Sequence, residues 1–195
     1  MTSQPKRKQL SHDRIVEVAA RAIRRAGYRG VGVADIMKEA GLTHGGFYAH
    51  FASRDALLVE AMQRASRDSR MALEQAVERR MAKGGSRFEA LVWAYLHDAN
   101  IEASEQGCVV AALASEMTRQ EDAVRDEARS RVKELLSLVE NAWPPGSDTA
   151  QAAVVAATMV GALQLARTLG GKAGRDLLAA TRQSLIRMHG AVPGA

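Results

Sequence analysis

Apolar residues recur in this chain at intervals of three and four over most of its length, which is the period of a helix that buries one face. The stripe Ile15, Val18, Ala19, Ala22 and Ile23 is one example, behind a cap at Ser11. The same spacing predicts further helices near 33–40, 43–50, 53–73, 88–96, 109–117, 121–143, 148–169 and 173–189. No stretch has the alternation that a strand needs. The pattern predicts an all-α fold of about nine helices.

The composition agrees with this fold class and excludes several others. Hydrophobic residues make up 47% and charged residues 25% of 195 positions, as in folded globular proteins. That length allows one domain or two small ones that share a core. The one cysteine excludes an internal disulfide framework and fits a reducing compartment.

The location predicted from the sequence is the cytoplasm. The first ten residues are polar and basic and lack the apolar core of a secretory signal. The most apolar stretch, 152–163, is shorter than the roughly 20 residues that span a membrane. We expect a buried helix there and no membrane partner.

Positive charge is concentrated in the first third of the chain. Residues 1–62 carry ten basic and six acidic side chains, whereas the remaining 133 carry 17 and 16. This asymmetry predicts an anionic partner for the N-terminal part. The basic run Lys6, Arg7 and Lys8 is either a solvated terminus or an arm that follows DNA.

The segment 27–58 has the spacing of a helix-turn-helix. Two helices of about eight residues, joined at Gly41, are too short to be stable without a third helix beneath them. The positions that such a motif buries hold Ile36, Ala40, Leu42 and Phe47. The N-terminus of the second helix would offer free N–H groups to phosphates or bases.

Four groups of residues carry a family resemblance. They are Ile15 through Gly27-Tyr28, Val33-x-x-Ile36-x-x-x-Ala40-Gly41-Leu42, Gly45-x-Phe47-Tyr48-x-His50-Phe51 and Ser53-Arg54-Asp55-x-Leu57. This pattern resembles the DNA-binding domain of the TetR (TetR/AcrR-type) family of transcriptional regulators, specifically over residues 9–69 and only in architecture over 70–195. The resemblance implies a DNA-binding domain at 9–69, with its helix-turn-helix at 32–51, and an effector-binding and dimerisation domain at 70–195.

The resemblance also implies which residues contact DNA. Tyr48 is expected to hydrogen-bond a phosphate, and Arg54 keeps the charge of the lysine usual in the family. His50 either packs beneath the recognition helix or contacts a phosphate. The groove-facing positions hold Thr43, His44, Gly45 and Gly46, with Arg29 as a further candidate for base readout.

Two positions depart from the family pattern. Gly32 stands where the family often has Thr or Ser, so the backbone N–H of Val33 is expected to take over that phosphate contact. Met37 stands where a smaller residue is common, so we expect slightly wider packing between the two short helices.

An apolar set in the predicted fourth to seventh helices is the candidate effector pocket. Its members are Met62, Phe88, Leu91, Val92, Tyr95, Cys108, Ala112 and Met117. Whether the side chain of Trp93 also faces inward stays open. With few polar groups nearby (Tyr95, His97, Asn100 and Gln164), the set predicts an unidentified, mainly apolar effector. The alternative is a closed core.

The helix predicted at 148–169 carries small residues on several faces and needs covering on more than one side. They are Ala152, Ala156, Gly161, Ala162 and Ala166. We expect them in a four-helix interface of a homodimer. The alternative is a core helix of a monomer.

Catalytic signatures are missing from the sequence. It has no phosphate loop, no nucleophile elbow and no convergent metal ligands, and Glu102, Glu105 and Glu116 are expected to be solvated. We therefore expect no enzyme, no cofactor and no metal, but a ligand-responsive regulator that represses a palindromic operator; activation stays an alternative. The rival function is a small thiol-dependent enzyme or redox sensor using Cys108, which begins a short helix, although a free cysteine is usually a small buried hydrophobe.

Overall fold

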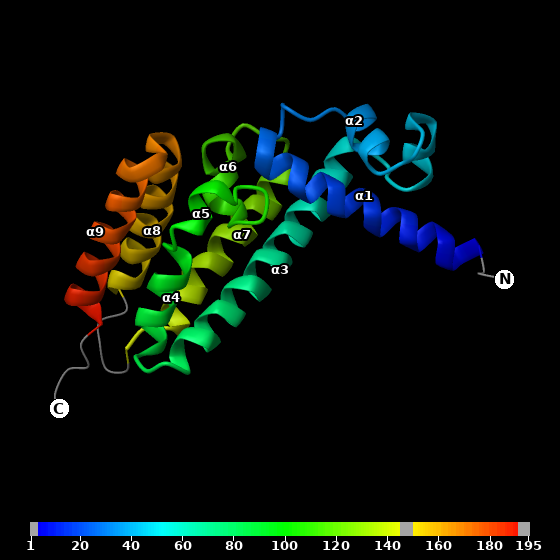
Figure 1. Cartoon of the computed structure of the whole chain (residues 1–195). Coiled ribbons are helices and arrows are strands. Elements are labelled where there is room, and N and C mark those ends of the chain that lie inside the picture. The colour runs from blue at the N-terminus through cyan, green and yellow to red at the C-terminus, as the bar shows by residue number, and fades with distance from the viewer. Residues whose placement is uncertain (1–3, 145–149, 191–195) are drawn as a thin grey trace. The chain divides into compact units, whose positions relative to one another are not determined.

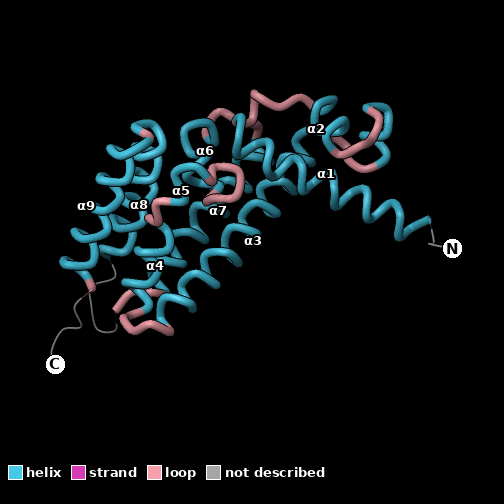
Figure 2. The backbone as a smooth tube through the Cα atoms, in the orientation of Figure 1, coloured by secondary structure: helices cyan, strands magenta, loops and turns pink. Residues whose placement is uncertain are grey.

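A computed structural model describes residues 4–144 and 150–190. Within these ranges all regular structure is helical (Figure 2), so the all-α fold is confirmed. In chain order the elements are α1 (Gln4–Ala26), α2 (Val33–Glu39), a 3-10 helix η1 (His44–Ala49), α3 (Arg54–Met81), α4 (Arg87–Tyr95), α5 (Ala99–Glu102), α6 (Val109–Met117), α7 (Asp122–Asn141), α8 (Ala150–Leu169) and α9 (Gly171–His189) (Figure 1).

The chain divides into two compact units. The first comprises Met1–Asp68 and Glu105–Arg131, and the second comprises Ser69–Ser104 and Val132–Ala195. The break after residue 68 lies beside the expected domain boundary at 69/70. Residues 105–131, however, pack with the N-terminal residues rather than with the rest of the expected C-terminal domain.

Helix α1 begins seven residues before the expected cap at Ser11, which lies inside the helix. The reason is local. Pro5 fits a first turn because it has no N–H to satisfy, and the residues from Lys6 to Leu10 favour helix. Lys6, Arg7 and Lys8 are therefore exposed side chains of a helical turn and do not form an extended arm.

Arg24 joins three parts of the first unit. Its guanidinium donates to the carbonyls of Ala20 at 2.9 Å, Ala65 at 3.3 Å and Gly107 at 3.2 Å. The side chain is only 5% exposed, and burial lowers its pKa. A buried cation needs such partners, so these three carbonyls hold α1 against α3 and the segment before α6.

In the second unit, α8 and α9 form a closely packed pair (Figure 1). Gly170 has φ +64 at the turn between them, a conformation that favours glycine. A Cβ on Gly174 would overlap the carbonyl oxygen of Ala166, so the two helices approach each other through a residue without a side chain. Helix α9 also packs on α4, and α8 packs on α5.

Helix α8 is long and apolar enough to cross a membrane by length and composition, with a mean hydropathy of 1.5 in its most apolar window. Core helices of globular proteins meet the same criterion. Seven of its residues are buried in the second unit, namely Ala152, Val155, Ala156, Met159, Ala162, Leu163 and Ala166. These seven residues form the buried face of α8.

Candidate nucleic-acid interface

The expected pair of short helices is present in the first unit. Helix α2 ends at Glu39, and the amide of Gly41 donates to the carbonyl of Lys38 at 3.0 Å. Gly41 has φ +73, the left-handed conformation expected for the turn, and Leu42 then donates to Met37 at 2.8 Å. The chain thus leaves α2 through a closed turn and enters η1.

The second helix of the pair lies where expected but is a 3-10 helix of six residues. The amide of Gly46 bonds the carbonyl of Thr43 at 3.0 Å, and that of His50 bonds Phe47 at 2.9 Å. Adjacent glycines are poor α-helix formers, which accounts for hydrogen bonds that join residues three positions apart instead of four. Thr43 stands at the N-cap without a side-chain cap hydrogen bond.

The buried side of the pair matches the sequence pattern. Ile36, Ala40 and Phe47 are buried, and Leu42 is half-buried. Met37 is fully buried, and its Cε would lie 3.7 Å from a Cβ on Gly46. A side chain at Gly46 would therefore begin in ordinary van der Waals contact with Met37.

The outer side of the pair presents little side-chain bulk. Thr43, His44 and Gly45 are exposed, and a Cβ added at Gly45 would meet no atom within 4 Å. Tyr48 is 75% exposed and packs edge-on against Phe47, with ring centroids 5.2 Å apart. This surface combines accessible backbone with one exposed phenol.

His50 packs inside the first unit. Its Nδ1 is buried and has no hydrogen-bond partner among the described residues, and its ring lies 6.1 Å from that of His12. His12 stacks on Phe51 at 4.6 Å and bonds Glu60 at 2.7 Å. Burial lowers the pKa of His50, and the nearby His12 and Lys8 lower it further.

The remaining expected contact residues lie around the start of α2 and α3. Arg29 is exposed. Gly32 is the N-cap of α2 without a side-chain cap, and Val33 is half-buried. Arg54 is half-buried, and its guanidinium donates to the backbone carbonyl of Tyr28. Arg54 therefore connects the start of α3 to the loop that follows α1.

This loop is anchored by residues that the sequence did not reveal. Tyr28 is fully buried; its backbone N–H donates to Glu116 at 3.1 Å and its hydroxyl to Met62 Sδ at 2.7 Å. Burial also raises the pKa of the Tyr28 hydroxyl. Glu116 is half-buried and bound, so the expectation that it is solvated was wrong.

A second connection runs through Arg25. Its guanidinium bonds Glu105 at 3.1 Å and Glu39 at 3.3 Å, and these hydrogen bonds raise its pKa. Glu105 was expected to be solvated, and it is paired instead. Arg25 thereby links α1, α2 and the segment before α6.

The residues expected to line the effector pocket are divided between the two units. Met62, Cys108, Ala112 and Met117 belong to the first unit, and Phe88, Leu91, Val92 and Tyr95 belong to the second. Most are buried, whereas Cys108 and Ala112 are half-buried. The second unit contains two cavities that are lined by other residues, among them Trp93.

The expected interface residues lie mostly inside the chain. Ala152, Ala156, Ala162 and Ala166 are at most 7% exposed within a single copy, so they offer almost no surface to a second copy. Gly161 is half-buried. The exposed apolar residues of the same helix include Val154, Ala157, Leu165 and Leu169, and with Gly161 these four follow helical spacing.

Comparison with known proteins finds similarity in the N-terminal sequence and in the fold. The sequence model of the tetR family of bacterial regulatory proteins matches residues 15–61. No curated protein matches the chain. Among solved structures, a TetR-family regulator from Agrobacterium tumefaciens covers 94% of this chain and 100% of its own, at 22% identity and TM-score 0.75.

Two further solved structures share the fold. A TetR regulator from Chloroflexus aurantiacus is 23% identical with TM-score 0.76 and covers 94% of this chain and 98% of its own. AibR, in complex with isovaleryl coenzyme A and operator DNA, is 19% identical with TM-score 0.62 and covers 92% of this chain and 98% of its own. The family match and the shared fold agree with the resemblance found in the sequence.

Proposed function

We propose that the chain is a TetR-family transcriptional regulator, which its N-terminal sequence and its fold support, and that it acts as a homodimeric, ligand-responsive repressor of a palindromic operator. The observation that carries this proposal is the surface of η1. A short helix with exposed backbone at Gly45 and an exposed phenol at Tyr48 stands on the domain that matches the family.

Phosphate contacts supply most of the proposed binding energy. Tyr48 has a free outer surface and donates its hydroxyl to a phosphate oxygen. Arg54 uses one N–H on the Tyr28 carbonyl and offers the others to the DNA backbone. The N–H of Val33 serves as a further donor at the start of α2. Such contacts fix the position of the protein and make its affinity fall with salt.

Base readout rests on few groups. Thr43 and His44 are exposed beside Gly45, and Arg29 is exposed in the preceding loop. The lack of a side chain at Gly45 allows the backbone of η1 to approach the groove floor closely. Gly46 lies against Met37 and makes no contact of its own with the bases.

Dimerisation is proposed through the exposed side of α8. Val154, Leu165 and Leu169 are 56–59% exposed, and exposed apolar stripes of this kind mark association surfaces. A second copy related by a two-fold axis would present two recognition helices, which a palindromic operator matches. The four buried alanines of α8 serve the packing of the single chain.

The response to an effector is proposed to reach the DNA-binding surface through α6. Glu116 accepts a hydrogen bond from the amide of Tyr28, and Glu105 accepts one from Arg25. Helix α6 and the segment before it therefore bond directly to the C-terminal end of α1 and to the loop after it. AibR shows that a protein with this fold binds an acyl coenzyme A and operator DNA together. A ligand that favours another position of α6 would shift the population of DNA-binding states.

The rival function is a thiol enzyme or redox sensor at Cys108. This residue is half-buried at the N-cap of α6. The described residues contain no group of three His, Cys, Asp or Glu that could hold a metal. We propose a non-enzymatic protein, because within residues 4–144 and 150–190 no hydrogen bond joins the thiol to an acid or a base, and we propose that it acts in the cytoplasm, where an operator would lie.

Selection of bound genomic DNA fragments tests the proposal. The wild-type chain should enrich a palindromic sequence, and Gly45→Leu should lose it because a bulky side chain would clash with the groove floor. Gly84→Ala, in a loop of the second unit, is the control and should enrich the same sequence. Enrichment by Gly45→Leu as strong as by wild type would remove η1 from the groove.

A further inference from the structure

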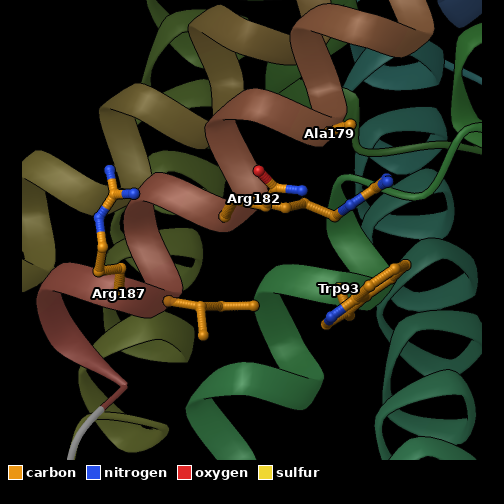
Figure 3. A pocket seen from close by; sticks show the side chains of 6 residues that line it. Trp93, Ala179, Arg182 and Arg187 are labelled. Carbon is orange, nitrogen blue, oxygen red and sulfur yellow. The ribbon is translucent and has the colours of Figure 1, made fainter.

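Two cavities in the second unit share one side chain, Trp93 of α4. The smaller has a volume of about 350 Å³ and is lined by Trp93, Ala179, Arg182, Gln183, Ile186 and Arg187. The larger has a volume of about 640 Å³ and extends from Trp93 to the end of α3 and to α5. Figure 3 shows Arg182 reaching from α9 toward Trp93. Volumes of this size suit small molecules.

The charge around both cavities has a single sign. The larger is lined by Arg79, Arg80 and Lys83 together with His97, and the smaller by Arg182 and Arg187. No Asp or Glu lines either of them. Five of the eleven Lys and Arg side chains of the second unit thus surround one tryptophan.

The end of α3 explains only part of this concentration. Ala76, Arg79 and Arg80 follow each other at helical spacing, so they share one face at the C-terminal end of α3, and Lys83 lies in the turn directly after it. Cations are favoured there by the helix dipole. The dipole of α3 does not account for the two arginines that α9 contributes from the other side of Trp93.

Direct contacts hold the centre of the cluster. The guanidinium carbons of Arg80 and Arg182 lie 4.3 Å and 4.4 Å from the centroid of the Trp93 ring, within the range of cation–π attraction. Arg182 is only 8% exposed and bonds Asp98 at 2.9 Å. The positions of Trp93 and Arg182 are therefore fixed by packing.

The outer cations are not neutralised in the same way. Among the described residues, Arg79, Arg80, Lys83 and Arg187 make no ion pair. Like charges held around one site raise the free energy of that site. A structural clamp on Trp93 uses Arg80 and Arg182 and leaves the charges of Arg79, Lys83 and Arg187 uncompensated, whereas an anion bound among them would offset their repulsion.

We propose that these two cavities bind a small organic anion with at least two separated negative groups, phosphate or carboxylate. Its charged groups pair with Arg79 and Lys83 on one side of Trp93 and with Arg187 on the other. Its carbon skeleton packs along Ile186 and the edge of the Trp93 ring, whose faces Arg80 and Arg182 cover. The site differs in place and chemistry from the apolar pocket expected from the sequence, and it does not depend on the proposed DNA binding.

Titration of the full chain without DNA tests this site. Trp93 and Trp143 are the two tryptophans, so Trp143→Phe leaves Trp93 as the sole fluorescent reporter. Inorganic pyrophosphate and citrate, added at constant ionic strength, represent the phosphate and the carboxylate chemistry. Either should give a saturable change with one site per chain and a Kd below about 1 mM. Calorimetry on the wild-type chain repeats the measurement, because Trp143 itself packs on Phe88.

The double variant Arg79→Gln/Lys83→Gln should weaken binding at least roughly tenfold, since it removes two charge-assisted contacts. Arg175→Gln is the matched control; Arg175 is an exposed cation of α9 outside both cavities and should not matter. Three results would overturn the proposal: no saturable binding of either anion, equal weakening by Arg175→Gln, or loss of binding in Arg29→Gln, which would move the anion to the DNA-binding surface.

Discussion

The carboxylate of Glu116 accepts a hydrogen bond at 3.1 Å from the backbone N–H of Tyr28, although 88 positions separate them. The contact requires Gly27. A Cβ there would lie 2.9 Å from the carboxyl carbon of Glu116, and φ is +74. The end of α1 is therefore fixed by a residue of α6, and the loop that leads to α2 starts from that fixed point.

Replacement of Gly27 by alanine should destabilise the protein through two separate effects. The positive φ costs about 1–2 kcal/mol for any residue with a Cβ. The overlap falls on the carboxylate of the flexible Glu116 side chain, which must move and give up its hydrogen bond to Tyr28, at a further cost of about 0.5–1.5 kcal/mol. Gly84→Ala is the control, because Gly84 has φ +96 and open space around it. Alanine there has the cost of the positive φ but overlaps with no other atom. Urea unfolding measures both variants, and equal losses would disprove the role of Glu116.

Replacement of Tyr48 by phenylalanine should lower affinity by a similar factor for the operator and for its single-base variants. The lost hydroxyl is the proposed phosphate contact, and phosphates carry no sequence information. The slope of affinity against salt should stay unchanged because tyrosine is neutral.

His44→Ala is the comparison for Tyr48→Phe, since His44 is exposed at a groove-facing position. It should relax discrimination at one base position rather than lower all affinities alike. Anisotropy titrations over a set of operator variants measure both changes. A loss confined to one base position in Tyr48→Phe would contradict the phosphate assignment.

Stability should fall in mild acid because of His50. Its pKa lies below the ordinary value of 6.5 because of burial, His12 and Lys8. The unfolded chain therefore binds a proton more readily than the folded one, so the contribution of His50 is fully present above about pH 6.5 and is lost as pH falls through the lowered pKa. His50→Gln should lose less stability than wild type between pH 7 and pH 5.

The control for this pH series is His44→Gln, because His44 is exposed on the same short helix. Its stability should follow the wild-type dependence on pH. Thermal unfolding at several pH values provides the measurement. A wild-type curve parallel to that of His50→Gln would show that His50 does not titrate within this range.

The proposed dimer should depend on the exposed side of α8. Leu165→Glu places a charge in the stripe that includes Val154 and Leu169, and an unpaired charge in an apolar interface is strongly destabilising. We expect folded monomers in sedimentation experiments and weak operator binding. Gln75→Glu, on an exposed position of α3, should remain dimeric. A dimeric Leu165→Glu chain would place the interface elsewhere.

The features predicted from the sequence are those that depend on neighbours along the chain. The turn at Gly41, the cap of α3 at Ser53 and the buried face of α2 each follow from residues within a few positions. Arg24 and Glu116 do not, because their partners lie up to 83 and 88 positions away. Nothing in the local pattern separates such residues from solvated ones.

The two cavities and the proposed association surface on α8 could not be predicted from the sequence for a related reason. Helix α4 buries five of its nine residues, so periodicity alone could not assign a direction to Trp93. The small residues of α8 indicated close packing, but the sequence could not say against which helix. The structure places Ala166 against Gly174 of the same chain and leaves Leu165 outside.

The division between the two units falls inside α3 and inside α7, and this limits how the length of the chain can change. One inserted residue in a continuous helix turns everything beyond it by about 100°. Neither helix can absorb such a change near residues 68 or 131 without breaking its own register. A fragment that ends at residue 69 would also lose Gly107 and Glu116, the acceptors of Arg24 and Tyr28. The part proposed to read DNA is thus not expected to fold as a separate domain, and insertions should accumulate in loops such as residues 82–86.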